Sequence, residues 1–322
     1  MANVNQSAPD AATTKHRSQY AGIVLVTLAA LFWSLNGALI KIVCDGGRGP
    51  DGVTIAFYRS LFAGLFLLPV ARGKWRSLVG PDGAIKIGFR ALIPRPAALW
   101  CVFFFTLMTA FFVVANTMTE AANVIILQYT STFWVFVLSP MILKERPGSR
   151  DLWILALALT GIGTIFAGNA SANLAGLVIA LASGLFYALL TLMIRWLRDA
   201  DSAAVTVFNN LGSAALLLPV VLFVGDLTVS TRSLLLLIFM GVVQFGIPYY
   251  LYTLGLARVP AYQAALITML EPVLVPIWAY LAVGEQAPRM TMIGGGVVLM
   301  ALLLFVNAAR RANGRVIADQ TV

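Results

Sequence analysis

Residues 21–43 read AGIVLVTLAALFWSLNGALIKIV, a long apolar run near the start of the chain. Because the hydrocarbon core of a bilayer is about 30 Å thick, roughly 20 consecutive apolar residues suffice for one membrane-spanning helix. A related run, AGLVIALASGLFYALLTLMIRWL, occupies residues 175–197. The two runs share the pairs Ala-Gly and Leu-Phe, and an isoleucine followed by a basic residue. The sequence therefore predicts a membrane helix that occurs twice.

The whole chain has the composition of a membrane protein. Of its 322 residues, 60% are hydrophobic and only 11% are charged, which is far more apolar than a soluble domain. Ten apolar segments of spanning length can be marked off, near 20–44, 52–72, 97–117, 121–143, 151–169, 173–197, 203–224, 233–257, 260–283 and 290–309. We therefore predict an all-α integral membrane protein with ten transmembrane helices.

The distribution of Lys and Arg residues predicts the orientation of the chain. If the N-terminus lies in the cytoplasm, 17 of the 22 basic residues fall on the cytoplasmic side of the predicted spans and four fall outside. Cytoplasmic loops carry an excess of Lys and Arg, so both termini are expected in the cytoplasm. This orientation also explains the net charge of +9, and no nucleic-acid partner is expected.

The second half of the chain repeats the first half. Besides the two runs quoted above, LFAGLFLLPV at 61–70 aligns with LGSAALLLPV at 211–220. Each copy contains five spans, and because five is odd the second copy must lie upside down. The predicted parts are a cytoplasmic tail at 1–19, a first repeat at 20–169 with a basic cytoplasmic loop at 73–96, an inverted repeat at 170–309 and a cytoplasmic tail at 310–322.

Inverted repeats around a central cavity are typical of transporters that work by alternating access. The alternative is a duplication that merely builds a larger helix bundle. No paired carboxylates, nucleophile with a base, or cluster of metal ligands stands out in the sequence, and the single histidine, His16, lies in the predicted tail. We therefore expect a transporter rather than an enzyme, with no cofactor and no bound metal.

Polar and aromatic residues near the centres of several spans predict where a substrate binds. Polar groups at this depth are costly in lipid and usually face a bundle interior or a water-filled cavity. The candidates are Trp33, Asn36, Gln128, Thr132, Tyr187, Gln244, Tyr249 and Glu271. Together they predict an aromatic chamber for a small amphipathic solute. The alternative is that the aromatic residues pack in the core and that the amides join neighbouring helices.

The ninth span contains LITMLEPVLVP at 266–276, which places a carboxylate and two prolines inside an apolar segment. Pro272 cannot donate a hydrogen bond to the carbonyl of Thr268, so we expect this span to bend or loosen near its middle, helped by Pro276. Pro248 predicts a similar kink or gate in the eighth span. Glu271 has three interpretations: a structural partner of Arg59 or of the kinked backbone, a proton carrier, or a contact for a substrate amine.

Arg59 lies in AFYRSLF, about two turns into the second span on its outer side. It could reach the outer headgroups by snorkelling, or it could pair with a carboxylate on a substrate or on Glu271. Glycines in the fifth span, Gly161 and Gly163, and at 294–296 in the tenth allow close helix packing. We expect those two helices to pack together within one chain or across a dimer.

Two motifs carry a family resemblance, YRSLFAGLFLLP at 58–69 and LEPVLVPIWAYLAVGEQ at 270–286. With the repeated five-helix unit across about 20–309, they make the chain similar to the EamA-type, ten-helix branch of the drug/metabolite transporter superfamily. The first repeat departs from the family pattern, with Ser131-Thr132 in place of Glu-Pro and Lys144-Glu145 in place of Gly-Glu.

The resemblance implies a bacterial inner-membrane carrier that exports amino acids or related metabolites. It also implies a cavity walled by the first, third, fourth, sixth, eighth and ninth helices, which adds Trp100, Phe104 and Met108 from the third. The aromatic wall favours the subgroup of YddG-like amino-acid exporters.

The sequence thus predicts a secondary transporter that exports amino acids, aromatic or other apolar ones, by alternating access. Its partners would be a small-molecule substrate and the lipid bilayer; the use of protons and the choice between monomer and homodimer stay open. The alternatives are a carrier of cationic drugs or nucleotide precursors, a membrane-embedded enzyme, and a scaffold or receptor without flux.

Overall fold

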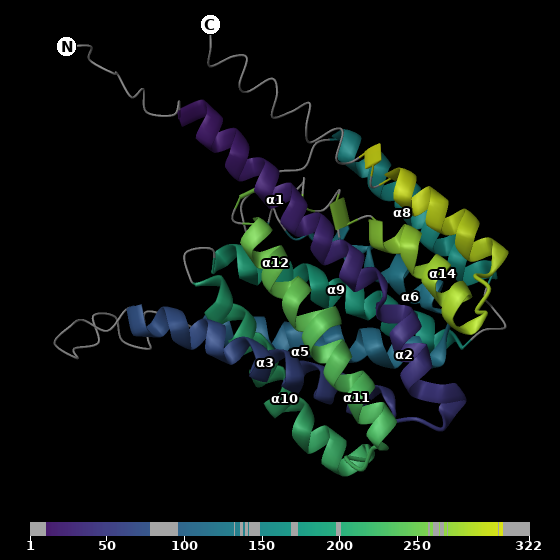
Figure 1. Ribbon diagram of the computed structural model, residues 1–322. Coiled ribbons are helices and arrows are strands. Elements are labelled where there is room, and N and C mark those ends of the chain that lie inside the picture. Colours follow the sequence, from purple (N-terminus) through teal and green to yellow (C-terminus); the bar gives the residue numbers. More distant parts are fainter. Residues whose placement is uncertain are drawn as a thin grey trace, which may run out of the picture.

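In the computed structural model the chain is built from helices (Figure 1). The structure describes residues 11–77, 96–131, 149–168, 173–197, 201–256 and 270–301, with isolated residues at 132–141, 257–269 and 303–304. Over these residues it contains helices and turns but no β-strand, so the prediction of an all-helical chain is confirmed.

Each of the ten predicted spans coincides, wholly or partly, with a helix in the described residues. The first half contains α1 (Ala11–Ser34), α2 (Asn36–Cys44), the short 3-10 helix η1 (Asp45–Gly47), α3 (Gly52–Ser77), α5 (Pro96–Met118), α6 (Ala121–Gln128) and α8 (Ser149–Gly168). The second half contains α9 (Leu174–Trp196), α10 (Ser202–Val224), α11 (Thr231–Phe239), the π-helix η2 (Met240–Gly246), α12 (Ile247–Leu256), α14 (Leu270–Val283) and a last helix at Arg289–Ala301.

Six of these helical stretches, within the described residues, are long and apolar enough to cross a bilayer. They are Tyr20–Gly47, Gly52–Ala71, Ala98–Met118, Leu174–Ile194, Ser202–Val224 and Thr231–Gly255. Large apolar side chains on the outside of the bundle, such as Phe223 at 88% exposure and Trp153 at 79%, would be costly in water. Lipid is the solvent that this surface fits.

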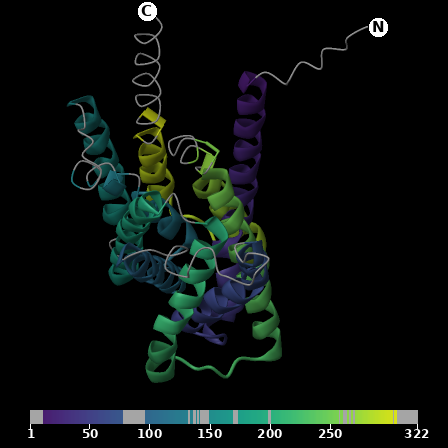
Figure 2. The same ribbon diagram turned by 90° about the vertical axis from the view of Figure 1, so that its left-hand side faces the viewer.

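Helices pair across the two halves of the chain. The helix α5 packs against α9, and α1 packs against α12, while α3 packs against α10. Each pair joins one helix from each predicted repeat. In the predicted repeat α5 corresponds to α12 and α9 corresponds to α1, so the α5–α9 pair and the α12–α1 pair are equivalent. Figure 2 shows α1 beginning, and the last helix ending, on the same side of the bundle. This arrangement supports the proposed inverted repeat.

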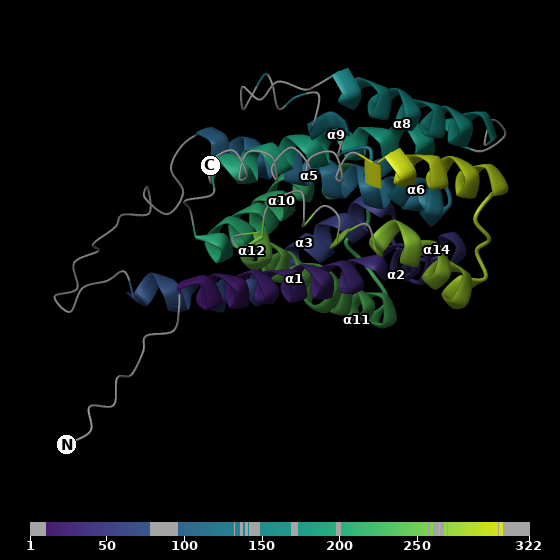
Figure 3. The ribbon, with the colours of Figure 1, turned by 90° about the horizontal axis from the view of Figure 1, so that it is seen from above.

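The predicted packing of the fifth and tenth spans is found within one chain. A Cβ placed on Gly161 of α8 would lie 2.7 Å from the carbonyl oxygen of Gly294 in the last helix. Only a glycine permits that approach. Figure 3 shows α8 and the last helix side by side at one edge of the bundle.

Two spans are less regular than the sequence predicts. The first span, expected as one helix, is interrupted at Leu35, where α1 ends and α2 begins. The eighth contains the seven-residue π-helix η2 directly before Pro248. Proline has no N–H to give the carbonyl four residues earlier, that of Gln244, so a widened turn is a reasonable outcome at this point.

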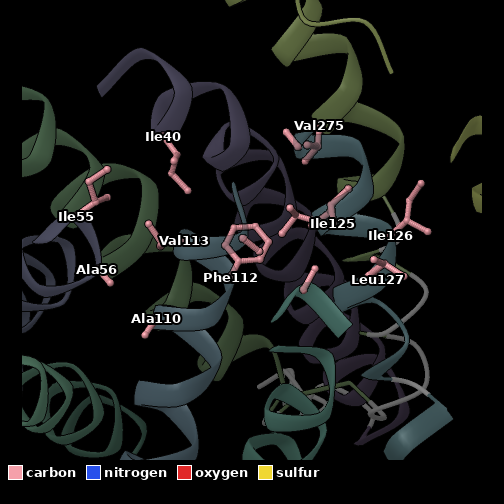
Figure 4. Packing of buried hydrophobic residues seen from close by; sticks show 14 of the residues in the cluster. Ile40, Ile55, Ala56, Ala110, Phe112, Val113, Ile125, Ile126, Leu127 and Val275 are labelled. Carbon is pink, nitrogen blue, oxygen red and sulfur yellow. The ribbon is translucent and has the colours of Figure 1, made fainter. Parts of the chain in front are cut away.

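The apolar core lies where both halves meet. Residues of α2, α3, α5, α6 and α14 converge there, among them Ile40, Ile55, Phe112, Ile125 and Val275 (Figure 4). All five are at most 3% exposed, and Phe112 also lines the cavity described below. This packing holds the inner walls of that cavity in place.

Candidate functional site

A cavity lies at the junction of the helices that carry the predicted site residues. Its walls are formed by Trp33, Asn36, Arg59, Met108, Phe112, Gln128, Tyr129, Tyr187, Phe245, Tyr249 and Glu271. These residues come from α1, α2, α3, α5, the end of α6, α9, η2, α12 and α14. The space open to the centres of water molecules is about 50 Å³, enough for a few waters.

Arg59 reaches this cavity from α3 and is only 1% exposed. Its Nη1 donates to Asn36 Oδ1 at 2.7 Å, and its Nη2 donates to Thr109 Oγ1 at 2.5 Å. Its Cζ lies 4.2 Å from the centre of the Phe245 ring, a cation–π contact. All three partners are neutral, and no carboxylate pairs with Arg59 in the described part of the chain.

The snorkelling interpretation of Arg59 is wrong, because its guanidinium is held inside the bundle by partners on two other helices. The expected pairing with Glu271 is also absent, although both side chains line the same cavity. A buried charge with neutral partners is costly, so it needs a reason beyond packing.

Glu271 lies in the first turn of α14 and is 8% exposed. Its Oε1 lies 2.9 Å from the hydroxyl of Tyr129, the residue that follows α6. The same hydroxyl donates to the backbone carbonyl of Thr268 at 2.5 Å. Pro272 has no N–H, so it cannot donate the helical hydrogen bond to the carbonyl of Thr268. Glu271 thus contacts Tyr129 and not Arg59, and Tyr129 in turn donates to the backbone near the proline.

Aromatic rings cover much of the remaining wall. Trp33 packs edge-on against Tyr249, with ring centres 5.6 Å apart, and lies 5.0 Å from the ring of Tyr252. Tyr249 also contacts Phe245 at 5.9 Å. The indole Nε1 of Trp33 and the Nε of Arg59 are buried and have no hydrogen-bond partner among the described residues.

Three elements are joined by a charged cluster at one end of the bundle. Lys41 of α2 forms an ion pair with Glu285, with Nζ and Oε2 3.0 Å apart, and also donates to the carbonyl of Thr119 at 2.8 Å. Glu285 accepts at 2.7 Å from the N–H of Ala121, the first residue of α6. An acidic group is favoured at a helix N-terminus. We call these residues the end clamp.

On each chain segment that contributes to it, the end clamp is displaced from the cavity residues of that segment in the same direction across the membrane. Lys41 follows Asn36 by five residues, Ala121 precedes Gln128 by seven, and Glu285 follows Glu271 by fourteen. In the predicted orientation all three displacements point to the outer face of the membrane.

The structure brings most of the predicted site residues together. Trp33, Asn36, Met108, Gln128, Tyr187, Tyr249, Glu271 and Arg59 all line the cavity. Phe104 does not; it stacks with Trp100 at 5.6 Å and with Phe186 at 6.5 Å, beside the cavity wall. Gln244 is buried in η2, and its side-chain amide has no hydrogen-bond partner in the described structure. Thr132 lies outside the described residues.

The predicted proline positions differ in kind. Pro248 stands at the second position of α12, after the π-helix. Pro272 lies in α14 four residues after Thr268, which is also helical, so the carbonyl of Thr268 lacks its helical N–H partner, and Pro276 lies further inside that helix. Three wall residues were not predicted, namely Phe112, Tyr129 and Phe245. Tyr129 and Phe245 directly follow the predicted Gln128 and Gln244, and this adjacency in sequence could have identified them as wall residues.

Comparisons with known proteins agree with this architecture. The pattern that defines the EamA-like transporter family matches residues 20–167 and again residues 174–307. An uncharacterized transporter of Archaeoglobus fulgidus is 28% identical over 284 residues, covering 88% of this chain and 95% of its own. The uncharacterized transporter YwfM of Bacillus subtilis is 25% identical over 301 residues, covering 89% and 94%. A crystal structure of 18% identity has the same fold, with a TM-score of 0.64 over 90% of this chain and 97% of its own.

Proposed function

We propose that this chain, which belongs to the EamA-like transporter family and is therefore a multi-pass membrane transporter, exports amino acids with apolar or aromatic side chains. The proposed location is the bacterial inner membrane, with both termini in the cytoplasm. Export is proposed from the family resemblance, and the nature of the solute is proposed from the cavity.

One observation carries the choice of solute. Arg59 and Glu271 are both buried, both line the cavity, and neither is paired with a side chain of opposite charge in the described residues. A buried charge without a counter-charge is strongly unfavourable. A zwitterion supplies both counter-charges in one molecule, its carboxylate to Arg59 and its ammonium to the ionised form of Glu271. An α-amino acid has this chemistry.

The neighbouring groups complete the fit. A carboxylate at Arg59 could also accept from the unused N–H groups, Arg59 Nε and Trp33 Nε1. Asn36 and Gln128 provide further polar contacts on the wall. The side chain of the solute would meet the aromatic groups, where apolar area is favourable and an additional cation–π contact to the ammonium can form.

Alternating access is proposed from the two repeats that enclose the cavity. We infer that the two proposed repeats rock against each other, and that the end clamp of Lys41 and Glu285 closes the outer side. Binding and release would then alternate between the two faces.

Two other solute classes fit less well. An organic cation would be repelled by the buried charge of Arg59 and would satisfy only Glu271. An anionic nucleotide precursor would satisfy Arg59 but would be repelled by an ionised Glu271. Both remain carriers of the same family, and the experiment below separates them from an amino-acid carrier.

The test is counterflow in proteoliposomes with a labelled aromatic or aliphatic amino acid. Three unlabelled competitors share one side chain: the amino acid, its carboxamide, which lacks the carboxylate, and the corresponding amine. We expect only the complete amino acid to compete, and we expect Arg59→Met to abolish counterflow. Arg232→Met, a change of the same kind at an exposed residue of α11, is the matched control and should leave counterflow unchanged. Equal competition by the amine would instead identify a carrier of organic cations.

A further inference from the structure

The hydroxyl of Tyr129 is within hydrogen-bond distance of two oxygens. One is the carbonyl oxygen of Thr268 at 2.5 Å, and the other is Oε1 of Glu271 at 2.9 Å. A carbonyl oxygen can only accept, and an ionised carboxylate can also only accept. A phenolic hydroxyl has a single hydrogen. Both contacts can therefore be full hydrogen bonds only if Glu271 carries a proton, which it donates to the Tyr129 oxygen while Tyr129 donates to Thr268.

Loss of that proton changes the arrangement. An ionised Glu271 competes for the hydrogen of Tyr129, because a hydrogen bond to a charged acceptor is stronger than one to a neutral carbonyl. The hydroxyl then turns toward the carboxylate, and the Thr268 carbonyl loses its bond to Tyr129. The proton released by Glu271 passes to water in the cavity.

The Thr268 carbonyl stands at a special place in the chain. In a continuous helix it would accept from the N–H of residue 272, which is Pro272 and has none. Tyr129 supplies that hydrogen bond from α6 instead. The Tyr129–Thr268 hydrogen bond thus connects the residues just before α14 to the residue that follows α6. Whether this hydrogen bond forms depends on the charge of Glu271.

We propose that Tyr129 is a positioning residue that couples the proton on Glu271 to the position of α14, so that the carrier exchanges protons for solute. This inference rests on the proposed function. The ammonium of the solute needs the ionised carboxylate, so solute and proton exclude each other at Glu271. One proton enters as one zwitterion leaves. Proton binding restores the Tyr129–Thr268 hydrogen bond, and solute binding releases it.

Other titratable groups face the same space. Arg59, Tyr187 and Tyr249 line the cavity with Glu271, and Tyr252 packs against Trp33 behind them. Tyr129 is itself part of the proposed coupling, as the hydrogen-bond partner of Glu271 and Thr268. Glu271 is the only acidic side chain among the lining residues that the structure describes, so it is the group there that can exchange a proton for an ammonium ion.

The experiment compares two kinds of flux in the same proteoliposomes. Counterflow at equal pH tests the proposed function. Net efflux stimulated by a proton gradient directed into the vesicles, with the outside acidic, tests the coupling. We expect Glu271→Gln to remove the pH stimulation completely. In Tyr129→Phe the pH stimulation is compared with counterflow by the same variant, and we expect that ratio to fall by roughly fivefold, the effect of one hydrogen bond. Tyr280→Phe makes the same change on the exposed side of α14 and should behave as wild type.

An infrared measurement gives a second readout that does not depend on flux. The carbonyl stretch of a protonated carboxyl group should be present in the purified protein at neutral pH, vanish in Glu271→Gln and shift in Tyr129→Phe. Wild-type pH stimulation and an unshifted band in Tyr129→Phe would overturn the proposal. Failure of wild-type counterflow with the expected infrared changes would instead count against the amino-acid substrate and leave the Tyr129–Glu271 coupling supported.

Discussion

Ionisable side chains are partly or fully buried in two regions of the described structure, and the fold treats them differently. At the end clamp, Lys41 and Glu285 pair at 3.0 Å, and each has a further backbone partner. In the cavity, Arg59 and Glu271 lie around the same space but are held by neutral groups. The fold pairs the first two charges with each other, and it leaves Arg59 and the ionised form of Glu271 for a solute to neutralise.

The difference teaches which charges serve structure and which serve binding. The side chains of the end clamp keep 22% and 15% exposure, whereas Arg59 is 1% exposed and Glu271 is 8% exposed. Desolvation costs rise with burial, so the cavity charges would gain more from direct pairing than the clamp charges do. That they do not pair is the strongest sign of function in the structure.

The largest expected effect comes from removing one cavity charge. In Arg59→Met the solute carboxylate loses its counter-charge, and transport should fall by more than about 100-fold, as truncating a buried charge partner typically costs. Stability should fall much less than transport, because Arg59→Met leaves no unpaired charge behind and only the neutral acceptors of Asn36 and Thr109 lose a partner, at about 1–3 kcal/mol. Counterflow and thermal unfolding in detergent measure the two quantities. A parallel loss of both would show that Arg59 is structural, like the end clamp.

Fixing the end clamp should stop transport without touching the cavity. In a chain whose Cys44 and Cys101 are replaced by Ala, a cleavable bifunctional thiol reagent would join Lys41→Cys to Glu285→Cys. Because we propose that this end opens in each cycle, cross-linking should abolish counterflow and cleavage should restore it. Either single cysteine variant treated in the same way is the control. Transport through the cross-linked protein would exclude the end clamp as a gate.

A double-mutant cycle measures the contrast between the two regions directly. Lys41→Met and Glu285→Gln should each lower the free energy of unfolding by about 1–3 kcal/mol, since each leaves a partner unpaired, and their effects should be strongly non-additive. Arg59→Met and Glu271→Gln, which share a cavity but form no ion pair, should show a smaller interaction energy than the end-clamp pair in the absence of solute. Strong coupling of the second pair would mean that the cavity charges already neutralise each other.

Much of the fold could be predicted because lipid imposes a simple rule. A helix must be roughly 20 apolar residues long to span a bilayer, so runs such as 21–43 are visible in the sequence. The same rule identifies residues that violate it, and Asn36, Gln128 and Glu271 were found as polar groups in apolar runs. The structure places all three on one cavity.

The contacts among these residues could not be predicted, because they depend on how distant helices align. Arg59 is held by Asn36 and Thr109, which are 23 and 50 residues away. Tyr129 meets Glu271 across 142 residues, and as a tyrosine in an apolar run it resembles any core residue. Likewise, Pro248 predicted an irregular eighth span, but only the structure identifies a π-helix.

The smallest expected effect concerns a charge that accepts hydrogen bonds from backbone N–H groups at a helix N-terminus. Asp201 precedes α10, and its carboxylate accepts from the N–H groups of Ala203 and Ala204 at 2.9 and 3.0 Å. Asp201→Ala should lower the free energy of unfolding by about 1 kcal/mol, the usual value of a helix cap, while Asp201→Asn should keep most of it. Counterflow should be unchanged in both variants, because α10 contributes no residue to the cavity wall. A transport defect in Asp201→Ala at normal stability would show that charges serving the fold can also govern flux, and the distinction between the two regions would then fail.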